Sequence, residues 1–324
     1  MKNKCIALVL AAVLLLPLLN GCTAQYYGGI KERKDGQEDA YTQDILPRSM
    51  DNAYGDQKSA TLYFRYLSED MLAGVEQQFN VTAENTLEEM VVQALIDGPQ
   101  DTSYQYNALV NPNTVLIAVK EQSGYLSVTL SGEFAEKMDE DILADAARRR
   151  LAVQSIVNSL ISIGNYSRVL ILIDDDNNGI GERMTYEEAG WEEKGDRTME
   201  PMEMDVSVLL TPENVMKLVM DGLVEKDYGY IEYYLSGQDF DDDSGVEYAG
   251  LSAAMEEKFS VVGYELSGPA IVSGDGLRAV TLINVTYIDK AGKTAQLTGI
   301  PIRMLNEGVW KVSLRSLQEM LPEY

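Results

Sequence analysis

The spacing of hydrophobic and polar residues from residue 60 onward predicts first a strand and then a helix. The strict alternation at residues 60–67 predicts a strand. Apolar residues then recur at helical spacing over residues 87–95. Thr86 and Glu89 form a capping box at the start of this helix, and Gly98-Pro99 predicts its end.

The next stretch predicts two more strands, a second helix and a final strand. Residues 115–120 and 125–130 read as a hairpin that turns at Ser123-Gly124. Helical spacing returns at residues 153–161, and residues 169–173 form the continuous apolar run of a central strand. The predicted order is therefore β-α-β-β-α-β.

A different order follows after a connector rich in Met and Glu at residues 199–205. Thr211-Pro212-Glu213 places an N-cap before a proline at the first helical position and predicts a helix to about residue 224. We expect two further helices at residues 228–235 and 248–259, and strands at residues 261–266, 277–288, 294–305 and 309–314. The sequence thus predicts an α+β protein with two domains, residues 60–198 and 206–324.

The N-terminus predicts a lipid anchor. Lys2 and Lys4 precede an apolar run at residues 6–19, which is short for a membrane span. Leu19-Asn20-Gly21-Cys22 resembles a bacterial lipobox, so residues 1–21 are expected to be a signal peptide, with lipid such as palmitate carried on Cys22. An ordinary secretory signal or an uncleaved anchor is the alternative. The polar residues 22–59 would form a flexible tether.

Charge and composition narrow the classes of function. The formal charge is −26, and loss of Lys2 and Lys4 with the signal peptide would make it −28, which argues against nucleic acid as a partner. Cys5 lies in the removed segment, so no internal disulfide is expected. The chain has no histidine, the commonest general base, and shows no catalytic motif. We therefore expect no enzymatic activity.

Several phrases of the first domain resemble the GerMN family of sporulation and spore germination proteins, over residues 60–190. They are residues 90–99 (MVVQALIDGP), 126–134 (LSVTLSGEF), 156–160 (IVNSL) and 168–173 (RVLILI). The resemblance implies an extracytoplasmic α/β module that binds an envelope protein or further copies of itself. It supplies no catalytic residues. This chain carries the module once, whereas the namesake pattern repeats it.

The second domain resembles the nuclear-transport-factor-like cone fold. The resemblance rests on helices followed by an antiparallel sheet, with Gly308-Val309-Trp310-Lys311-Val312 in the last strand. A diverged second copy of the first module is the alternative, against which the early helices and the long final sheet argue.

One loop has the composition of a calcium site. Asp174, Asp176, Asn178 and Glu182 place oxygen ligands at alternate positions around Gly179. Thr185 stands where a calcium loop of the helix-loop-helix type has its closing glutamate. The alternative is an acidic, solvated turn.

Three other clusters have a functional and a structural interpretation. Tyr228, Tyr230, Tyr233 and Tyr234 could line a ligand cavity, but packing is the favoured interpretation, as it is for Trp310. The basic run Arg148-Arg149-Arg150 could hold an acidic partner, although a solvated helix face that pairs with neighbouring carboxylates is favoured. Asp239 and Asp241-Asp242-Asp243 are interpreted as surface loop.

Together these features predict a membrane-anchored, extracytoplasmic lipoprotein that acts as a non-enzymatic protein-binding or scaffold component of the cell or spore envelope. The first alternative is a lipoprotein that binds a solute or wall polymer in a cavity of the second domain. The second is a hydrolase that uses only carboxylates.

Overall fold

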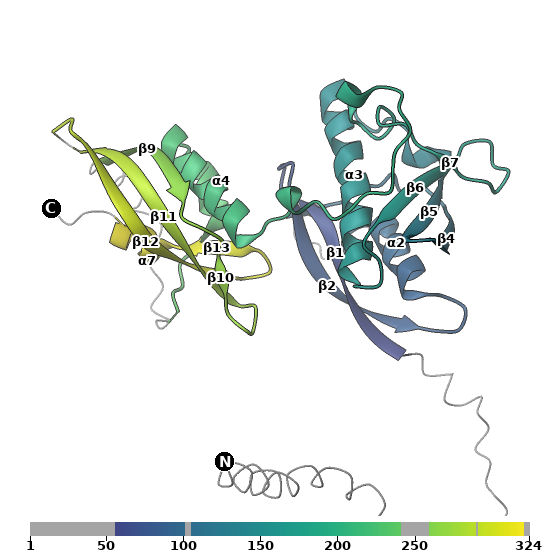
Figure 1. Ribbon diagram of the computed structural model, residues 1–324, viewed down its shortest axis with the longest axis horizontal. Helices are drawn as coiled ribbons and strands as arrows, with labels where there is room; N and C mark the ends of the chain where they lie inside the picture. The colour runs from purple at the N-terminus through teal and green to yellow at the C-terminus, as the bar shows by residue number, and fades with distance from the viewer. Residues whose placement is uncertain (1–55, 101–104, 241–258, 290, 321–324) are drawn as a thin grey trace, which may run out of the picture. The chain divides into compact units, whose positions relative to one another are not determined.

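The computed structural model describes residues 56–100, 105–240, 259–289 and 291–320 (Figure 1). The expected signal peptide, Cys22 and nearly all of the expected tether lie outside the described residues. Asp241-Asp242-Asp243 and residues 248–258 of an expected helix also lie outside them. Among the described helices, none is long and apolar enough to cross a membrane.

The segment predicted as the first domain has three layers, with two helices enclosed between two sheets (Figure 1). One sheet has the order β2-β1-β3 and the other β4-β5-β6-β7. The helices α2 and α3 contact β1 on one side, and β4 and β6 on the other. The element bounds are β1 (Asp56–Tyr66), β2 (Leu72–Val81), α2 (Leu87–Asp97), β3 (Tyr106–Asn107), β4 (Leu116–Gln122), β5 (Tyr125–Ser131), α3 (Ile142–Ser162), β6 (Val169–Asp174) and β7 (Glu182–Arg183).

The start of α2 confirms the predicted capping box. The Glu89 backbone N–H donates to Thr86 Oγ1 at 3.2 Å, and the Thr86 N–H donates to Glu89 Oε2 at 2.9 Å. These two bonds satisfy donors that a helix N-terminus leaves without a partner. Gly98 ends the helix with φ +82°, a backbone conformation that favours glycine.

Strand β2 is absent from the sequence prediction, which passed directly from the first strand to α2. It pairs with β1 in an antiparallel hairpin from Asp56↔Val81 to Arg65↔Leu72. The polar run Glu76-Gln77-Gln78 hides its alternation because β2 is an edge strand. A Cβ atom at Gly74 would lie 2.7 Å from Thr61 Cγ2, so the cross-strand side chains require glycine there.

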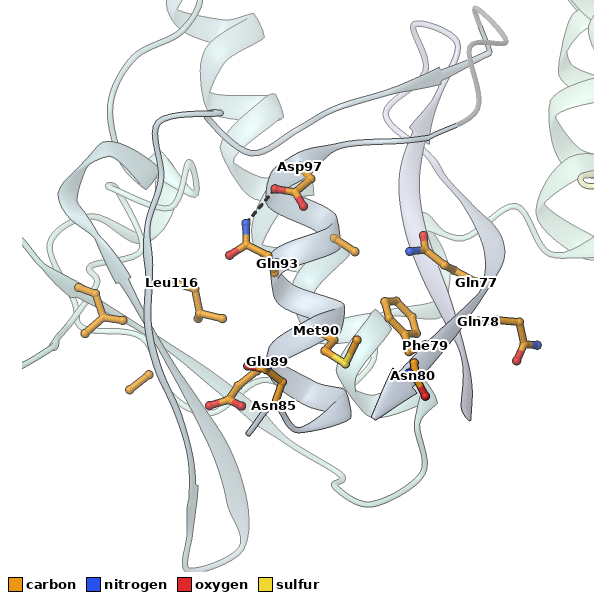
Figure 2. A pocket seen from close by; sticks show the side chains of 13 residues that line it. Gln77, Gln78, Phe79, Asn80, Asn85, Glu89, Met90, Gln93, Asp97 and Leu116 are labelled. Atoms are coloured by element: carbon orange, nitrogen blue, oxygen red, sulfur yellow. Dashed lines mark hydrogen bonds between the residues drawn. The ribbon is translucent and has the colours of Figure 1, made fainter. Parts of the chain in front are cut away.

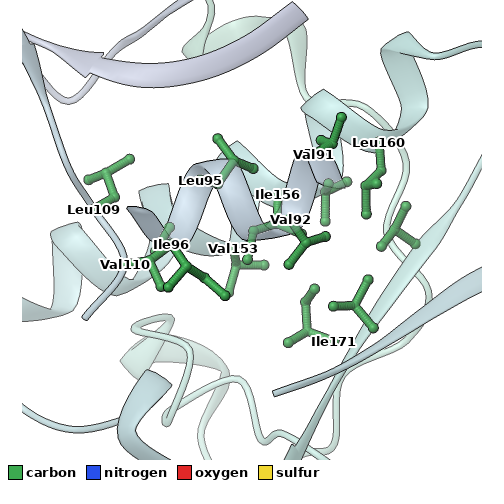
Figure 3. Packing of buried hydrophobic residues seen from close by; sticks show 14 of the residues in the cluster. Val91, Val92, Leu95, Ile96, Leu109, Val110, Val153, Ile156, Leu160 and Ile171 are labelled. Carbon is green, nitrogen blue, oxygen red and sulfur yellow. The ribbon is translucent and has the colours of Figure 1, made fainter. Parts of the chain in front are cut away.

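Helix α3 is buried on almost every side, whereas the spacing of its apolar residues predicted an amphipathic helix. It begins earlier than expected, at Ile142, where the Asp141 side chain accepts from the N–H groups of Leu143 and Ala144. The core includes Val153, Ile156 and Leu160 of α3 together with α2 and β6 side chains (Figure 3). Two sheets pack against α3, so its polar side chains are enclosed too. The buried polar ones in its second half are Gln154, Ser155, Asn158 and Ser159.

Two of these buried polar residues, Ser155 and Ser159, bond to the backbone of β1 on the side that faces away from β2. The Tyr63 N–H donates to Ser159 Oγ at 3.0 Å, and Ser155 Oγ donates to the Tyr63 carbonyl oxygen at 2.5 Å. One helical turn separates the two serines, which therefore lie on one face of α3. They bond to the backbone of β1 as a neighbouring strand would, and so join the helix layer to the hairpin.

Two other polar residues of α3 fix the segment that leads out of the first domain. Asn158 Nδ2 donates to the Asp205 carbonyl oxygen at 3.0 Å, while the Asp205 N–H donates to Asn158 Oδ1 at 2.9 Å. Gln154 Nε2 donates to the Asp205 carboxylate at 2.7 Å. Helix α3 thus holds both the hairpin and the connector.

The second domain is a sheet of the order β10-β11-β12-β13-β8, with β9 also pairing to β11. Helix α4 contacts β9, β11 and β13. The bounds are α4 (Pro212–Glu225), α5 (Tyr228–Ile231), β8 (Leu235–Ser236), β9 (Phe259–Leu266), β10 (Ile271–Val272), β11 (Arg278–Asp289), β12 (Thr294–Asn306), β13 (Trp310–Ser313) and α7 (Leu314–Met320). The described part of the chain also has four short 3-10 helices. Two lie in the first domain, η2 (Gly132–Phe134) and η3 (Glu192–Lys194), and two in the second, η4 (Val206–Val208) and η5 (Glu232–Tyr234).

The N-cap predicted for the first helix of this domain is confirmed. Thr211 Oγ1 accepts from the Asn214 N–H at 3.2 Å, and Pro212 is the first helical residue. The sequence prediction missed α7, whose residues follow directly on the last strand. Tyr66 and Ala73 of the first hairpin are buried in the same hydrophobic cluster as α4 and β11.

We predict that Ser159→Ala destabilises the protein by about 1–3 kcal/mol, because it leaves the Tyr63 N–H without an acceptor. Urea denaturation followed by circular dichroism measures this change. Ser162→Ala is the matched control, because Ser162 is exposed and its hydroxyl donates to the Ser159 carbonyl oxygen of its own helix at 2.7 Å, with only a long 3.4 Å contact to the Thr61 carbonyl oxygen of β1. Its loss is expected to stay within about 0.5 kcal/mol. Equal effects of the two substitutions would contradict the proposed bond.

Candidate functional site

A groove opens on one flank of the first domain, between β2, α2 and β4 (Figure 2). Its volume is about 610 Å³. The lining residues come from the edge strand of each sheet and from the outward face of α2. They are Gln77, Gln78, Phe79, Asn80, Asn85, Glu89, Met90, Gln93, Ala94, Asp97, Leu116, Ile117 and Ala118.

Polar side chains at intervals of four residues run along the floor of this groove. Glu89, Gln93 and Asp97 lie on α2, where the period of an α-helix places them in one row, and Asn85 lies just before the N-cap of the helix. Gln93 Nε2 donates to Asp97 Oδ1 at 2.8 Å, so the carboxylate and the amide orient each other (Figure 2). The row is therefore an ordered acidic surface.

The charged side chains that line the groove are all negative. Glu89 and Asp97 are carboxylates, and none of the lining residues given above is a lysine or arginine. An anionic ligand would meet uncompensated repulsion here, whereas a cationic or neutral polar group would be accepted. The groove thus favours a basic or neutral partner.

Both walls of the groove are free strand edges. In the described sheets, β2 and β4 each stand at the end of the strand order and pair on one side only. An edge strand presents backbone N–H and C=O groups that can pair with another chain. The sequence analysis did not find this site, although the uncharged run at residues 114–119 is a signal for it.

The loop proposed for calcium is held together by its own carboxylates. Asp174, which is buried, accepts from the N–H of Asn178 at 3.0 Å and from the N–H of Gly179 at 2.8 Å. Asp176 accepts from Asn178 Nδ2 at 2.7 Å. The loop turns at Asn177 and Gly179, both with positive φ. The structure therefore brings Asp174, Asp176 and Asn178 together.

Glu182 is the first residue of β7, directly after the turn, and pairs with Ile173 of β6. Within the described part of the chain, no group of three or more His, Cys, Asp or Glu residues is placed to hold a metal ion. Each oxygen of Asp174 accepts one backbone hydrogen bond and keeps a second lone pair. Calcium binding at this loop stays a prediction.

The basic run at residues 148–150 pairs with a neighbouring carboxylate, as the favoured interpretation expected, but Arg148 is buried, so the expectation of a solvated helix face was wrong. The Arg148 side chain is 9% exposed and that of Asp145 1% exposed, and they form an ion pair at 3.2 Å. Arg148 also donates to the carbonyl oxygens of Leu109 at 2.8 Å and Glu136 at 3.1 Å. Arg149 binds the other oxygen of Asp145 at 2.7 Å. Arg148 therefore joins α3 to the two segments that contain Leu109 and Glu136.

Burial alone would raise the pKa of Asp145. The backbone N–H of Met138, which donates at 2.9 Å, and the Arg148 guanidinium outweigh this effect and lower it. Asp145 is therefore held as an anion, and its charge offsets the two guanidinium groups around it.

The tyrosine cluster contributes mainly to packing. Tyr234 is fully buried, and its ring lies 5.6 Å from that of Tyr230 and 6.0 Å from that of Tyr66. Burial raises the pKa of Tyr66 to about 12. Tyr233 is exposed, so the cluster is not uniformly core. Trp310 is partly buried against the same hydrophobic cluster.

Asp239 was interpreted as part of a surface loop, and this was wrong. Its side chain is largely buried and accepts from Arg303 Nε at 2.8 Å. Arg303 also binds Glu319 of α7 at 2.7 Å. Asp239 therefore ties the segment after β8 to β12.

Comparison with protein-family models gives a match in the N-terminal part of the chain. Residues 61–179 match the model of the Germane family, described as "Sporulation and spore germination". This segment is a Germane domain, as the GerMN-like phrases of the sequence predicted. Comparison with curated proteins gives no significant match.

Two solved structures resemble the chain. One is a candidate lipoprotein from Clostridium perfringens, with 20% identity and a TM-score of 0.24 over 36% of this chain and 75% of that one. The other is the tandem GerMN domains of the sporulation protein GerM from Bacillus subtilis. It has 15% identity and a TM-score of 0.33 over 56% of this chain and 57% of GerM.

We predict that Arg148→Met costs about 3–5 kcal/mol of stability, because it removes one of the two cations at the buried Asp145 carboxylate and also the donor to the Leu109 and Glu136 carbonyl oxygens. Chemical denaturation at pH 7 measures the loss. Arg183→Met on β7 is the control, because Arg183 is exposed and its loss should stay within about 0.5 kcal/mol. A comparable loss in both variants would contradict the assigned role.

The acidic loop has a separate test. We predict weak calcium binding, with a dissociation constant of ~0.1–1 mM, because the loop lacks the bidentate closing glutamate of tight sites. Isothermal titration calorimetry in calcium measures it, with Asp176→Ala as the variant that removes one ligand. The absence of binding heat at millimolar calcium would leave the loop as an acidic turn.

Proposed function

We propose that this protein is a lipoprotein held on the extracytoplasmic face of the cell membrane, where it acts as a non-enzymatic, protein-binding component of the envelope during sporulation or germination. The Germane domain at residues 61–179 is the observation that carries the proposal. The lipobox-like Leu19-Asn20-Gly21-Cys22 supports the anchor.

The chemistry of the chain supports binding in preference to turnover. Histidine is absent from the sequence, and the mature chain would hold a single cysteine, which carries the lipid. The described carboxylates with short contacts serve structure: Asp145 joins two arginines, and Asp174 holds a turn. The flank groove, by contrast, offers two strand edges to a partner.

We predict that Cys22→Ser abolishes lipid modification and releases the protein from the membrane fraction, because acylation is the attachment that the sequence supplies. Mass spectrometry of the N-terminal peptide and cell fractionation measure the two effects. A variant that still carries diacylglycerol would show that the lipobox assignment is wrong.

Crosslinking in intact sporulating cells then tests the binding role. The wild-type chain should capture a specific envelope protein, and the Cys22→Ser chain should capture far less of it, because the variant leaves the membrane surface. Hydrolysis of peptidoglycan by the purified protein, lost on one carboxylate substitution, would overturn the non-enzymatic role. The alternative of a solute or wall-polymer binder predicts retention on isolated cell walls instead.

A further inference from the structure

We propose that the flank groove binds an extended, basic segment of a partner protein, which adds as a strand to the free edge of β4. The proposal rests on the protein-binding function above and names the site and the chemistry of the partner. Strand addition is a recurring mode of peptide recognition, in which backbone hydrogen bonds supply affinity and side chains supply specificity.

The first half of β4 lacks the charges that protect strand edges. Its residues 116–119, together with Thr114 and Val115 just before them, carry no charge and no proline, whereas Lys120 and Glu121 place charges in the second half of the strand. Val115 is 58% exposed, although it is apolar. The register irregularity between Leu116 and Ala118 is a protective feature of this first half. Such an edge is prone to pairing, so a partner strand would be well accommodated.

Charge decides which partner fits. Glu89 and Asp97 lie on the floor beside this edge, and the lining residues named for the groove include no cation. A second copy of this chain would bring the same carboxylates and a formal charge of −26. The occupant is therefore a basic strand from a different protein.

Spacing gives the partner a sequence pattern. Eight helical residues separate Glu89 from Asp97, which is about 12 Å along α2. Four residues of a strand cover about 13 Å and return to the same face. Figure 2 shows α2 running alongside β4, so basic residues at positions i and i+4 of the partner would each meet one carboxylate.

The probe is a nine-residue peptide of alternating valine and threonine, with lysines at its third and seventh positions, added to the full mature lipoprotein in detergent. Fluorescence anisotropy measures binding. A peptide with glutamates at the same two positions should not bind. Alternate backbone N–H groups of a strand point to opposite edges, and N-methylation removes them as donors. Methylation of the edge that pairs with β4 should weaken binding at least about tenfold, and methylation of the other edge should leave binding unchanged.

Charge removal on the protein supplies the matched test. Glu89→Gln/Asp97→Asn keeps the capping box, since glutamine also serves there, and should weaken the lysine peptide about threefold to tenfold. Glu192→Gln/Glu193→Gln removes two exposed charges from another surface and should leave binding unchanged.

Three results would overturn the proposal. The first is no binding, or equal weakening by methylation on both edges. The second is binding of a chitin tetrasaccharide that Glu89→Gln/Asp97→Asn abolishes, which would assign the groove to a wall glycan. The third is self-association that Ile117→Lys removes. If the peptide fails while crosslinking in cells still captures an envelope protein, the binding function stands and this site alone is wrong.

Discussion

The enclosure of α3 between two sheets is the constraint on which the first domain depends. A helix covered on both sides cannot leave polar groups to water, so each must find a partner within the protein. Ser155 and Ser159 meet this requirement by bonding to the Tyr63 backbone, which pairs with β2 on its other side. The same bonds attach the hairpin to the helices and therefore close the third layer.

The groove follows from this arrangement. Helix α2 packs beside α3, and its outer face lies between the edge strands of the two sheets. The strands β2 and β4 are therefore left as open edges on either side of a row of polar side chains. The hairpin also contributes Tyr66 and Ala73 to the second hydrophobic cluster, so one element serves two cores.

Local signals predicted much of this fold. The capping box at Thr86 and the N-cap at Thr211 were read correctly, because each depends on residues a few positions apart. Strand β2 and the burial of Arg148 could not be read, because they depend on contacts that tertiary structure creates. The groove combines an edge strand with a helix face, and its parts lie in separate segments of the sequence.

The central claim is that the two sheets and the helices between them form one cooperative unit. Native-state amide hydrogen exchange tests it most directly, by comparing the opening free energies of α3, β1 and β5 with that of global unfolding. The account predicts that the slowest amides of all three elements exchange only by global unfolding. Exchange of β1 at a much lower free energy, with α3 and β5 still protected, would show that the hairpin is not part of the unit.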